Sequence, residues 1–446
     1  MKKTTLTNTF AAMIAFAGVT GLQAQPATEF VPFNSFLRAT EDVNSTVLNR
    51  ADSKAKDAKT LEQMRRHILS MYQGVDVKHS FVTDSGTFDC VRADQQPSLR
   101  LSGKTSIAAL PPDSMLTRNS AQSNGTGEGL THPALAANAN SVDQFGNATS
   151  CEADTIPMKR ITLDDMVKFG SLQEFFEKGP DGTGRPVAAK PEADPASPSD
   201  GHKYAYMYQN VENIGGGSNL NVWNPLVDVN HGELMSLSQE WYIGGSGSTT
   251  QTAEVGWQVQ PLRWGTYSSV LFVYWTADDY SKTGCYNLTC PGFVQVSNRV
   301  AFGAPLGFTS TLGGDQYDIS AQYMLYQGNW WLAIDGIWIG YIDGSSYRGG
   351  QMSRNAQMIE YGTESAGNNS LWPAEGSGQW ATAGFGYAAY QRNMFYTDLS
   401  GNGYYASLTH ANPSPSCYNT AGPYNDDNPD WQVFFYAGGP GGATCQ

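Results

Sequence analysis

The chain has 446 residues, of which 40% are hydrophobic, 12% aromatic and 15% charged, and 27 basic against 41 acidic residues leave a net charge of -14. The apolar content suffices for a sizeable core, and the aromatic content is too high for a disordered chain. The acidic balance argues against a nucleic-acid partner, because a phosphate-binding surface needs an excess of Lys and Arg. No apolar run reaches about 18 residues, so we expect no multi-pass membrane protein.

The N-terminus has the pattern of a secretory signal peptide. Lys2 and Lys3 precede an apolar run from residue 11 to residue 19, and Ala24 is a small residue suited to a cleavage edge. We therefore expect a signal peptide over residues 1–24 and a secreted protein, extracellular or periplasmic. The alternative is a buried N-terminal helix.

Export makes disulfides plausible, and the six cysteines divide into two before and four after a proline-rich segment. Spacing alone does not fix the connectivity. Pairing within each part is the economical prediction: Cys90–Cys151, Cys285–Cys290 and Cys417–Cys445. A zinc site from Cys285 and Cys290 is the alternative, although no second ligand pair lies nearby in the sequence.

Composition divides the chain into two modules. Residues 1–201 hold 20 of the 27 basic residues and no Trp, whereas residues 202–446 hold all 11 Trp and 22 of the 23 Tyr. Five prolines between residues 179 and 200 prevent strand pairing and predict an exposed linker over residues 179–201. The predicted units are therefore residues 25–178 and residues 202–446.

The first module reads as a small α+β unit. Thr60 and Gln63 form a possible capping box, helical spacing of apolar residues follows as far as Met71, and Gly74 can end the helix. Residues 75–91 alternate as a hairpin does, and residues 161–178 have the apolar spacing of a second helix.

The second module reads as all-β. Short alternating runs of aromatic and β-branched residues recur between Gly, Asn and Asp clusters, which is typical of a β-sandwich or barrel. The clearest runs cover residues 203–210, 253–260, 270–276, 318–326, 330–341 and 431–437.

Carboxylates are the strongest chemical candidates in this module. Alternation puts Glu254, Gly256 and Gln258 on one face of a strand, opposite an apolar face of Val and Trp, and residues 360–364 repeat the pattern with two glutamates around a glycine. A glycine beside a carboxylate leaves room for a ligand against the sheet. The alternative is a pair of solvated strand faces with ordinary surface glutamates.

The wording of the sequence is more specific than its pattern. It resembles the neprosin family of glutamic peptidases over most of its length. The motifs that carry the resemblance are Phe88-Asp89-Cys90-Val91, Gln96-Pro97, Thr155-Ile156-Pro157-Met158-Lys159-Arg160, His202-Lys203-Tyr204-Ala205, Ser238-Gln239, Glu254-Val255-Gly256-Trp257-Gln258-Val259, Tyr274-Trp275-Thr276-Ala277-Asp278, Thr283-Gly284-Cys285-Tyr286-Asn287-Leu288, Cys290-Pro291-Gly292-Phe293-Val294-Gln295, Gly328-Asn329-Trp330-Trp331-Leu332, Gly376-Ser377-Gly378 and Ala388-Ala389-Tyr390.

The resemblance implies a secreted zymogen with an activation-peptide prodomain and an antiparallel β-sandwich peptidase domain of the concanavalin or jelly-roll kind. Family members favour cleavage after proline and work in acid. Two glutamates carry the reaction, and Glu254 matches the first. Glu364 matches the second, although Tyr361 stands where the family has Trp and Thr363 where it has Gly. Because of these departures, Glu360 on the same face is a rival.

Further roles follow as hypotheses. Gln258 and Tyr274 are candidates for oxyanion or substrate support, and Trp264 and Tyr361 could stack on a substrate proline. No cofactor and no metal are expected. The expected partners are protein or peptide substrates and the chain's own prodomain as inhibitor, with neither nucleic acid nor membrane, and we expect a monomer.

Two other functions stay open. A carbohydrate-binding β-sandwich would use Trp372 or Trp380 as a stacking platform. A glycosidase would use the same two carboxyls, held about 5–9.5 Å apart around a sugar bond. A peptidase pair should instead be close enough to contact one water.

Overall fold

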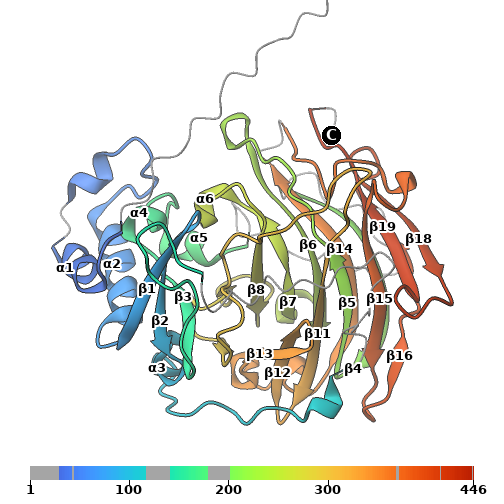
Figure 1. The fold of residues 1–446 in the computed structure, drawn as a ribbon, viewed down its shortest axis with the longest axis horizontal. Coiled ribbons are helices and arrows are strands. Elements are labelled where there is room, and N and C mark those ends of the chain that lie inside the picture. The colour runs from blue at the N-terminus through green and yellow to red at the C-terminus, as the bar shows by residue number, and fades with distance from the viewer. Residues whose placement is uncertain are drawn as a thin grey trace, which may run out of the picture.

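The computed structural model describes residues 30–42, 45–116, 141–178, 201–367, 371–411, 413–443 and 445. The predicted signal peptide and nearly all of the predicted linker lie outside the described residues. Figure 1 shows a small N-terminal unit, residues 30–178, beside a large unit of strands, residues 201–445. We call these the first and second modules.

The first module is a helical layer beside a three-stranded antiparallel sheet in the order β1-β2-β3. Its elements are α1 (Phe33–Glu41), α2 (Ala58–Tyr72), β1 (Val77–Thr83), β2 (Gly86–Arg92), α3 (Pro97–Arg100), β3 (Thr155–Lys159), α4 (Leu163–Met166) and α5 (Leu172–Phe176). The predicted hairpin over residues 75–91 is confirmed by β1 and β2.

Two helix predictions in this module need correction. The N-cap of α2 is Asp57, whose side chain accepts a hydrogen bond from the backbone nitrogen of Thr60, so the helix begins before the expected capping box. The single helix expected over residues 161–178 is two short ones. The break comes where Ser171 caps a new helix by accepting from the backbone nitrogen of Glu174.

The second module is an antiparallel β-sandwich, as predicted. One sheet has the order β10-β13-β12-β11-β5-β15-β19-β18, with β16 paired to β15, and the other has the order β17-β4-β14-β6-β7-β8-β9. The strands are β4 (His202–Asn213), β5 (Gly215–Asn221), β6 (Glu233–Gly244), β7 (Gln251–Val259), β8 (Val270–Thr276), β9 (Cys285–Tyr286), β10 (Phe293–Gln295), β11 (Asp318–Tyr326), β12 (Asn329–Ile334), β13 (Ile337–Ile342), β14 (Ala356–Gly367), β15 (Ala389–Thr397), β16 (Gly403–Tyr405), β17 (Thr409–Ala411), β18 (Asn419–Asn425) and β19 (Val433–Gly438); a short helix α6 (Pro261–Trp264) follows β7.

The run expected as one strand over residues 330–341 is a hairpin, β12 and β13. Asp335 and Gly336 turn the chain with φ values of 47° and 73°. Asp-Gly favours a two-residue hairpin turn because both positions need positive φ. The sequence signal for this turn was therefore present between Ile334 and Ile337.

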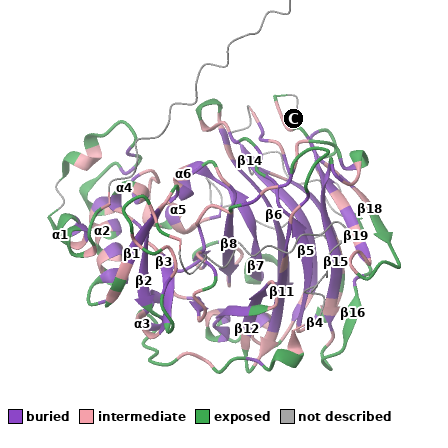
Figure 2. Cartoon of the chain, in the orientation of Figure 1, coloured by how far each residue is buried: buried purple, intermediate pink, exposed green. Residues whose placement is uncertain are grey.

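The core lies between the two large sheets, whose strands are mostly buried (Figure 2). Trp257 faces this core and donates from its indole nitrogen to the carbonyl of Asn221 in the opposite sheet at 2.9 Å. The apolar face predicted for β7 is thus the inward face. Its other face, with Glu254 and Gly256, points to the outside of the sandwich, where the first module covers it.

Three disulfides join the predicted pairs, Cys90–Cys151, Cys285–Cys290 and Cys417–Cys445. The zinc alternative for Cys285 and Cys290 is therefore wrong.

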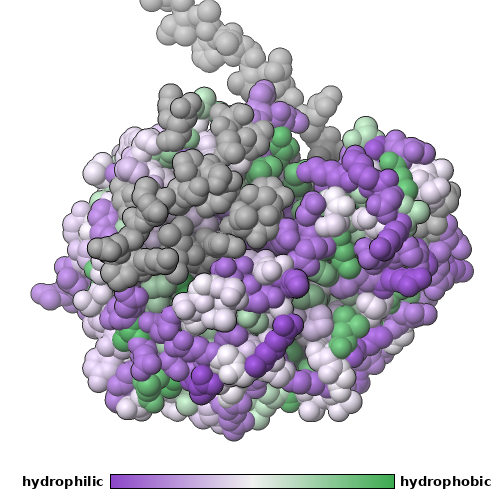
Figure 3. All heavy atoms as spheres, turned by 180° about the vertical axis from the view of Figure 1, so that it is seen from behind, coloured by the Kyte–Doolittle hydropathy of each residue, from purple (hydrophilic) through white to green (hydrophobic). Residues whose placement is uncertain are grey.

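None of the helices in the described ranges has the length and apolar character that crossing a bilayer requires. On the face seen in Figure 3, the exposed apolar residues of the described part are scattered among hydrophilic ones.

Candidate functional site

The two predicted glutamates lie on one sheet face, two rows apart. In the seven-stranded sheet, β6 lies between β7 and β14, and Trp241 of β6 is opposite both Glu254 and Glu360. Glu364 follows two rows along, opposite Leu237. Because antiparallel partners share a face, the register brings the two strand patterns together as the sequence predicted.

A lysine from the first module joins the two glutamates. Nζ of Lys178 lies 2.6 Å from Oε2 of Glu254 and 2.8 Å from Oε2 of Glu364. The side chains of Lys178 and Glu254 are 0% exposed and that of Glu364 is 1% exposed. The ammonium also lies 5.1 Å from the ring centroid of Trp241. One atom therefore contacts both carboxylates in a site closed to solvent.

Each carboxylate has further donors on its other side. Oε1 of Glu254 accepts from the hydroxyls of Thr252 at 2.7 Å and Tyr280 at 2.6 Å. Nδ1 of His202 lies 2.8 Å from Oε1 of Glu364, and Nε2 of Gln239 donates to Oε2 of Glu364 at 3.1 Å. Such multiple hydrogen bonding stabilises the ionised form of a buried carboxyl.

Burial and charge oppose each other in this cluster, and charge prevails at two groups. Burial opposes ionisation of Glu364, but Lys178 and then His202 hold the pKa of this carboxyl below its ordinary value. Burial likewise opposes the ammonium, but Glu254 and Glu364 together raise the pKa of Lys178 above its ordinary value. At neutral pH, both Lys178 and Glu364 are therefore charged.

Glu360, the rival for the second role, has a different environment. It is 2% exposed, and Lys178 donates to the other two glutamates rather than to it. Burial, followed by the negative charge of Glu254, raises the pKa of Glu360 well above its ordinary value. Burial therefore favours the neutral form of this side chain, in contrast to Glu364.

The glycines of the two motifs serve a purpose other than the expected one. Gly256 and Gly362 flank Gln239 in register, and a Cβ on Gly256 would meet the Cβ of Gln239 at 2.6 Å. A Cβ on Gly362 would similarly meet that of Tyr206 at 2.5 Å. The missing side chains therefore admit neighbouring strands and residues, among them the Gln239 amide that bonds to Glu364.

The four predicted support residues do not meet at the pair. Gln258 accepts from the Trp264 indole at 3.0 Å, so these two residues bond to each other. The hydroxyl of Tyr274 donates to the carbonyl of Phe176 at 3.2 Å. Tyr361 lies on the opposite face of β14 and donates to the Phe395 carbonyl across the core, so its proposed stacking on substrate is wrong.

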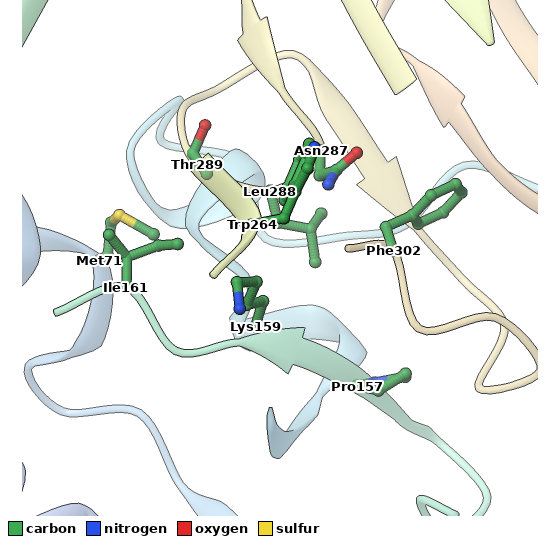
Figure 4. Close-up of a pocket in the computed structure, with 9 residues that line it drawn as sticks. All are labelled: Met71, Pro157, Lys159, Ile161, Trp264, Asn287, Leu288, Thr289 and Phe302. Atoms are coloured by element: carbon green, nitrogen blue, oxygen red, sulfur yellow. The ribbon is translucent and has the colours of Figure 1, made fainter. Parts of the chain in front are cut away.

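Trp264 also lines a small cavity between the modules (Figure 4). The cavity is lined by Met71, Pro157, Lys159 and Ile161 of the first module and by Trp264, Asn287, Leu288, Thr289 and Phe302 of the second. Trp264 is 3% exposed under this cover. Its side chain is thus at the module interface rather than at the carboxylate pair.

Sequence reasoning missed the cation and most of the supporting donors. Lys178 is the last charged residue before the proline-rich segment, and nothing in its local pattern distinguishes it from a helix-surface lysine. His202 and Gln239 were quoted only as matches to family wording. Their roles depend on the register of β4, β6 and β14, which a strand pattern does not specify.

The alternative functions receive little support from the described residues. Trp372, a proposed sugar platform, is 4% exposed and lies under the Lys203 ammonium, 4.6 Å from its ring centroid. Trp380 is 36% exposed. Two carboxylates that reach one nitrogen atom also fit one shared water better than an intervening sugar bond.

One other group of metal-ligand residue types comes together, in the first module. His79, Cys90 and Glu152 have candidate ligand atoms within 4.8 Å of one another. Cys90 is bonded to Cys151, and the two ring nitrogens of His79 lie 3.0 Å from Glu152 and 2.9 Å from the Ala148 carbonyl. These partners already occupy the ligand atoms, so the cluster is structural.

These observations define the class of protein as an antiparallel β-sandwich. On one sheet face it has two buried glutamates that contact the same lysine nitrogen. Residues 232–440 match the family model described as Neprosin. A solved structure of scytalido-glutamic peptidase with a transition state analog inhibitor is also similar. The similarity covers 52% of this chain and 96% of that chain, at 8% identity and a TM-score of 0.27.

Proposed function

We propose that the protein is a secreted glutamic peptidase made as an inactive precursor, with the first module as its prodomain. The observation that carries the proposal is the shared contact of Glu254 and Glu364 with the Lys178 ammonium. A position that contacts both carboxylates is where a hydrolytic water must lie. In the precursor the prodomain fills that position with a cation.

The chemistry follows from two carboxyls that compete for one proton. Without Lys178, two close buried carboxyls cannot both ionise cheaply, so the pair retains a proton and titrates as a unit. The ionised member takes a proton from a water molecule, and the oxygen of that water attacks the peptide carbonyl. The protonated member polarises that carbonyl and then protonates the leaving nitrogen. The donors from Thr252, Tyr280, His202 and Gln239 orient the two groups.

Latency should fail in acid, and the sign follows from Glu364. Its pKa is lowered in the closed precursor, so its contribution to holding Lys178 is present above the ordinary glutamate value of 4.5 and is lost as pH falls through the lowered value. The raised pKa of Lys178 only affects the alkaline side. Activation therefore belongs below about pH 4.5.

Four prolines of the linker, Pro186, Pro191, Pro195 and Pro198, are the proposed maturation sites. A peptidase that prefers proline could cut its own linker after one of them, leaving a mature chain that begins shortly before His202. The same preference is proposed for its substrates. Any host protease could also cut such a segment, so the experiment must separate the two routes.

The test is incubation of the purified precursor at about pH 4, near the ordinary glutamate pKa, with proline-containing peptides and with glycans. We expect peptide cleavage after proline, no glycan cleavage, and self-cleavage after a linker proline by mass spectrometry. The Glu254→Gln precursor should cleave neither the peptides nor its own linker. If that variant matures at the same rate and the same bonds, self-processing is wrong, and glycan cleavage without peptide cleavage would reject the peptidase.

A further inference from the structure

The last residues of the first module lie against the second module as a peptide. Helix α5 ends at Phe176, and Glu177 continues in extended conformation with φ -66° and ψ 151°. Lys178 then carries its side chain to the carboxylate pair. The segment from Phe175 to Lys178 thus runs along the sheet face toward the reacting groups.

Four successive carbonyls of this segment are hydrogen-bonded by the second module. Arg263 donates from Nη1 to the carbonyl of Phe175 at 2.6 Å and from Nη2 to that of Glu177 at 2.9 Å. Tyr274 donates to the carbonyl of Phe176 at 3.2 Å. Tyr286 donates to the carbonyl of Lys178 at 3.3 Å. We call Arg263, Tyr274 and Tyr286 the carbonyl ladder.

The second module itself positions this ladder. Arg263 is 6% exposed, its Nε donates to Gln260 at 2.9 Å, and its guanidinium lies 4.5 Å from the ring centroid of Tyr286. Tyr274 and Tyr286 pack edge to face, with centroids 4.9 Å apart. A planar guanidinium fixed in this way presents two donors in one direction, which suits two carbonyls of one chain. The second module thus orients the guanidinium from one side, and the Phe169 ring of the first module lies 4.9 Å from it.

We infer that the carbonyl ladder binds the main chain of a substrate on the N-terminal side of the bond that is cut. The inference rests on the proposed function, and it adds the residues and the side of the substrate. The direction comes from the segment itself, whose chain approaches the pair from its N-terminal end. Its last bound carbonyl, that of Lys178, belongs to the residue whose side chain lies at the pair.

The chemistry of the ladder matches a proline-containing ligand. Proline lacks a backbone N–H but keeps its carbonyl. A site that adds a peptide as a further strand needs N–H groups from the ligand, which proline does not supply. The three ladder residues act as donors in all four contacts, so these contacts demand nothing of the ligand that proline lacks.

A purely structural alternative exists. The last carbonyls of a helix have no partner within the helix, and the ladder could serve only to satisfy those of α5. Glu177 and Lys178 argue against this reading, because their carbonyls lie beyond the end of the helix and are bound all the same.

The experiment uses the acidified full chain and a set of peptides that share the cleaved bond and its C-terminal part. Their N-terminal arms range from a single residue to several. In wild type, kcat/KM should rise with the length of the arm. Arg263→Gln should lose that rise, with kcat/KM for the longest peptide about tenfold or more below wild type, mainly through KM, and that for the shortest nearly unchanged.

Tyr286→Phe and Tyr274→Phe remove one donor each with little change of shape, and we expect smaller losses of the same kind. Arg263→Lys keeps the charge but not the fork, and it replaces Arg263→Gln if that variant does not fold. Tyr361→Phe is the matched control, because it removes a buried hydroxyl from the opposite face. It should keep the wild-type length dependence.

Wild-type length dependence in Arg263→Gln, with faster maturation, would overturn the inference and assign the ladder to the prodomain alone. An equal loss for every length would also overturn it, because that is the effect of general damage. A wild-type chain that cuts no peptide would reject the proposed function and with it this inference. The first two outcomes are seen only where wild type is active, so the two failures are distinguishable.

Discussion

Two buried ion clusters, one on each large sheet, differ in where their cation comes from. Asp318 accepts from Arg392 at 2.6 and 3.2 Å and from Asn219 at 3.0 Å, and these residues belong to the adjacent strands β11, β15 and β5. On the other sheet, Glu254 and Glu364 belong to the second module, whereas Lys178 belongs to the first.

The difference separates a pair whose two charges belong to one module from a pair of carboxylates whose cation belongs to the other module. The Asp318 pair is balanced one to one and stays complete if the first module departs. The Glu254 and Glu364 pair loses its only described ammonium contact at that moment and keeps two buried carboxyls. Under the proposed function, the second kind of cluster marks the place of the reaction.

The largest expected effect concerns the carboxyls themselves. Glu254→Gln and Glu364→Gln should each lower kcat/KM of the acidified chain about a thousandfold, because an amide cannot exchange the proton that the pair must pass to and from water. Steady-state peptide hydrolysis measures this, and circular dichroism should show a wild-type fold.

Glu360→Gln is the matched control on the same face. Burial raises the pKa of its carboxyl and favours the neutral form, which an amide resembles, so this variant should retain most of the activity. If Glu364→Gln is active and Glu360→Gln is inactive, Glu360 rather than Glu364 is the second catalytic carboxyl.

Arg392→Met breaks the cluster of Asp318 and Arg392. This variant leaves the Asp318 carboxylate buried without its guanidinium, which should cost about 3–5 kcal/mol of unfolding free energy. Urea denaturation at neutral pH measures the loss. Lys178→Met should cost the second module far less, and an equal loss in the two variants would remove the distinction between the clusters.

Lys178→Met in the precursor tests the cluster of Glu254, Glu364 and Lys178. Loss of the cation from a buried charge contact should shift the closed state toward opening, with precursor activity before acidification raised about tenfold or more. Maturation should also begin at a higher pH than in wild type. Lys178→Arg keeps the charge and should stay latent, so equal latency in all three proteins would show that the lysine does not close the site.

Glu240, another buried carboxyl, sharpens the comparison with the smallest expected effect. Glu240 accepts from the hydroxyls of Ser218 at 2.5 Å and Tyr242 at 2.9 Å, and burial raises its pKa to about 8. Its contribution to stability is present below the ordinary value of 4.5 and is lost as pH rises through about 8.

Glu240→Gln should therefore change unfolding free energy by less than about 1 kcal/mol in acid and should be more stable than wild type above about pH 8. Denaturant midpoints at the two pH values measure the difference. A variant that is less stable at both would mean that Glu240 is ionised in the fold.

The sequence predicted the faces of the site better than its contents. Strict alternation was enough to put Glu254 with Gly256 on one face and Trp257 on the other, because a strand has a period of two. The hairpin at Asp335 was lost in a continuous apolar run, although its dipeptide was present. Tyr274 of the carbonyl ladder was a candidate for substrate support, but Lys178, Arg263 and Tyr286 could not be predicted, because their contacts join positions many residues apart through the docking of two modules.

The return of the chain at His202 has a consequence for the fate of the prodomain. Lys178 and His202 contact the two oxygens of one carboxylate, that of Glu364, although 23 residues separate them in the sequence. A cut anywhere in that loop separates two chains without removing a single contact at the site. Before the cut, the inhibitor is held at an effective concentration in the millimolar range typical of short tethers. Under the proposed function, the hold of the first module falls with dilution after the cut, so we expect a nicked protein that is inactive when concentrated and active when diluted.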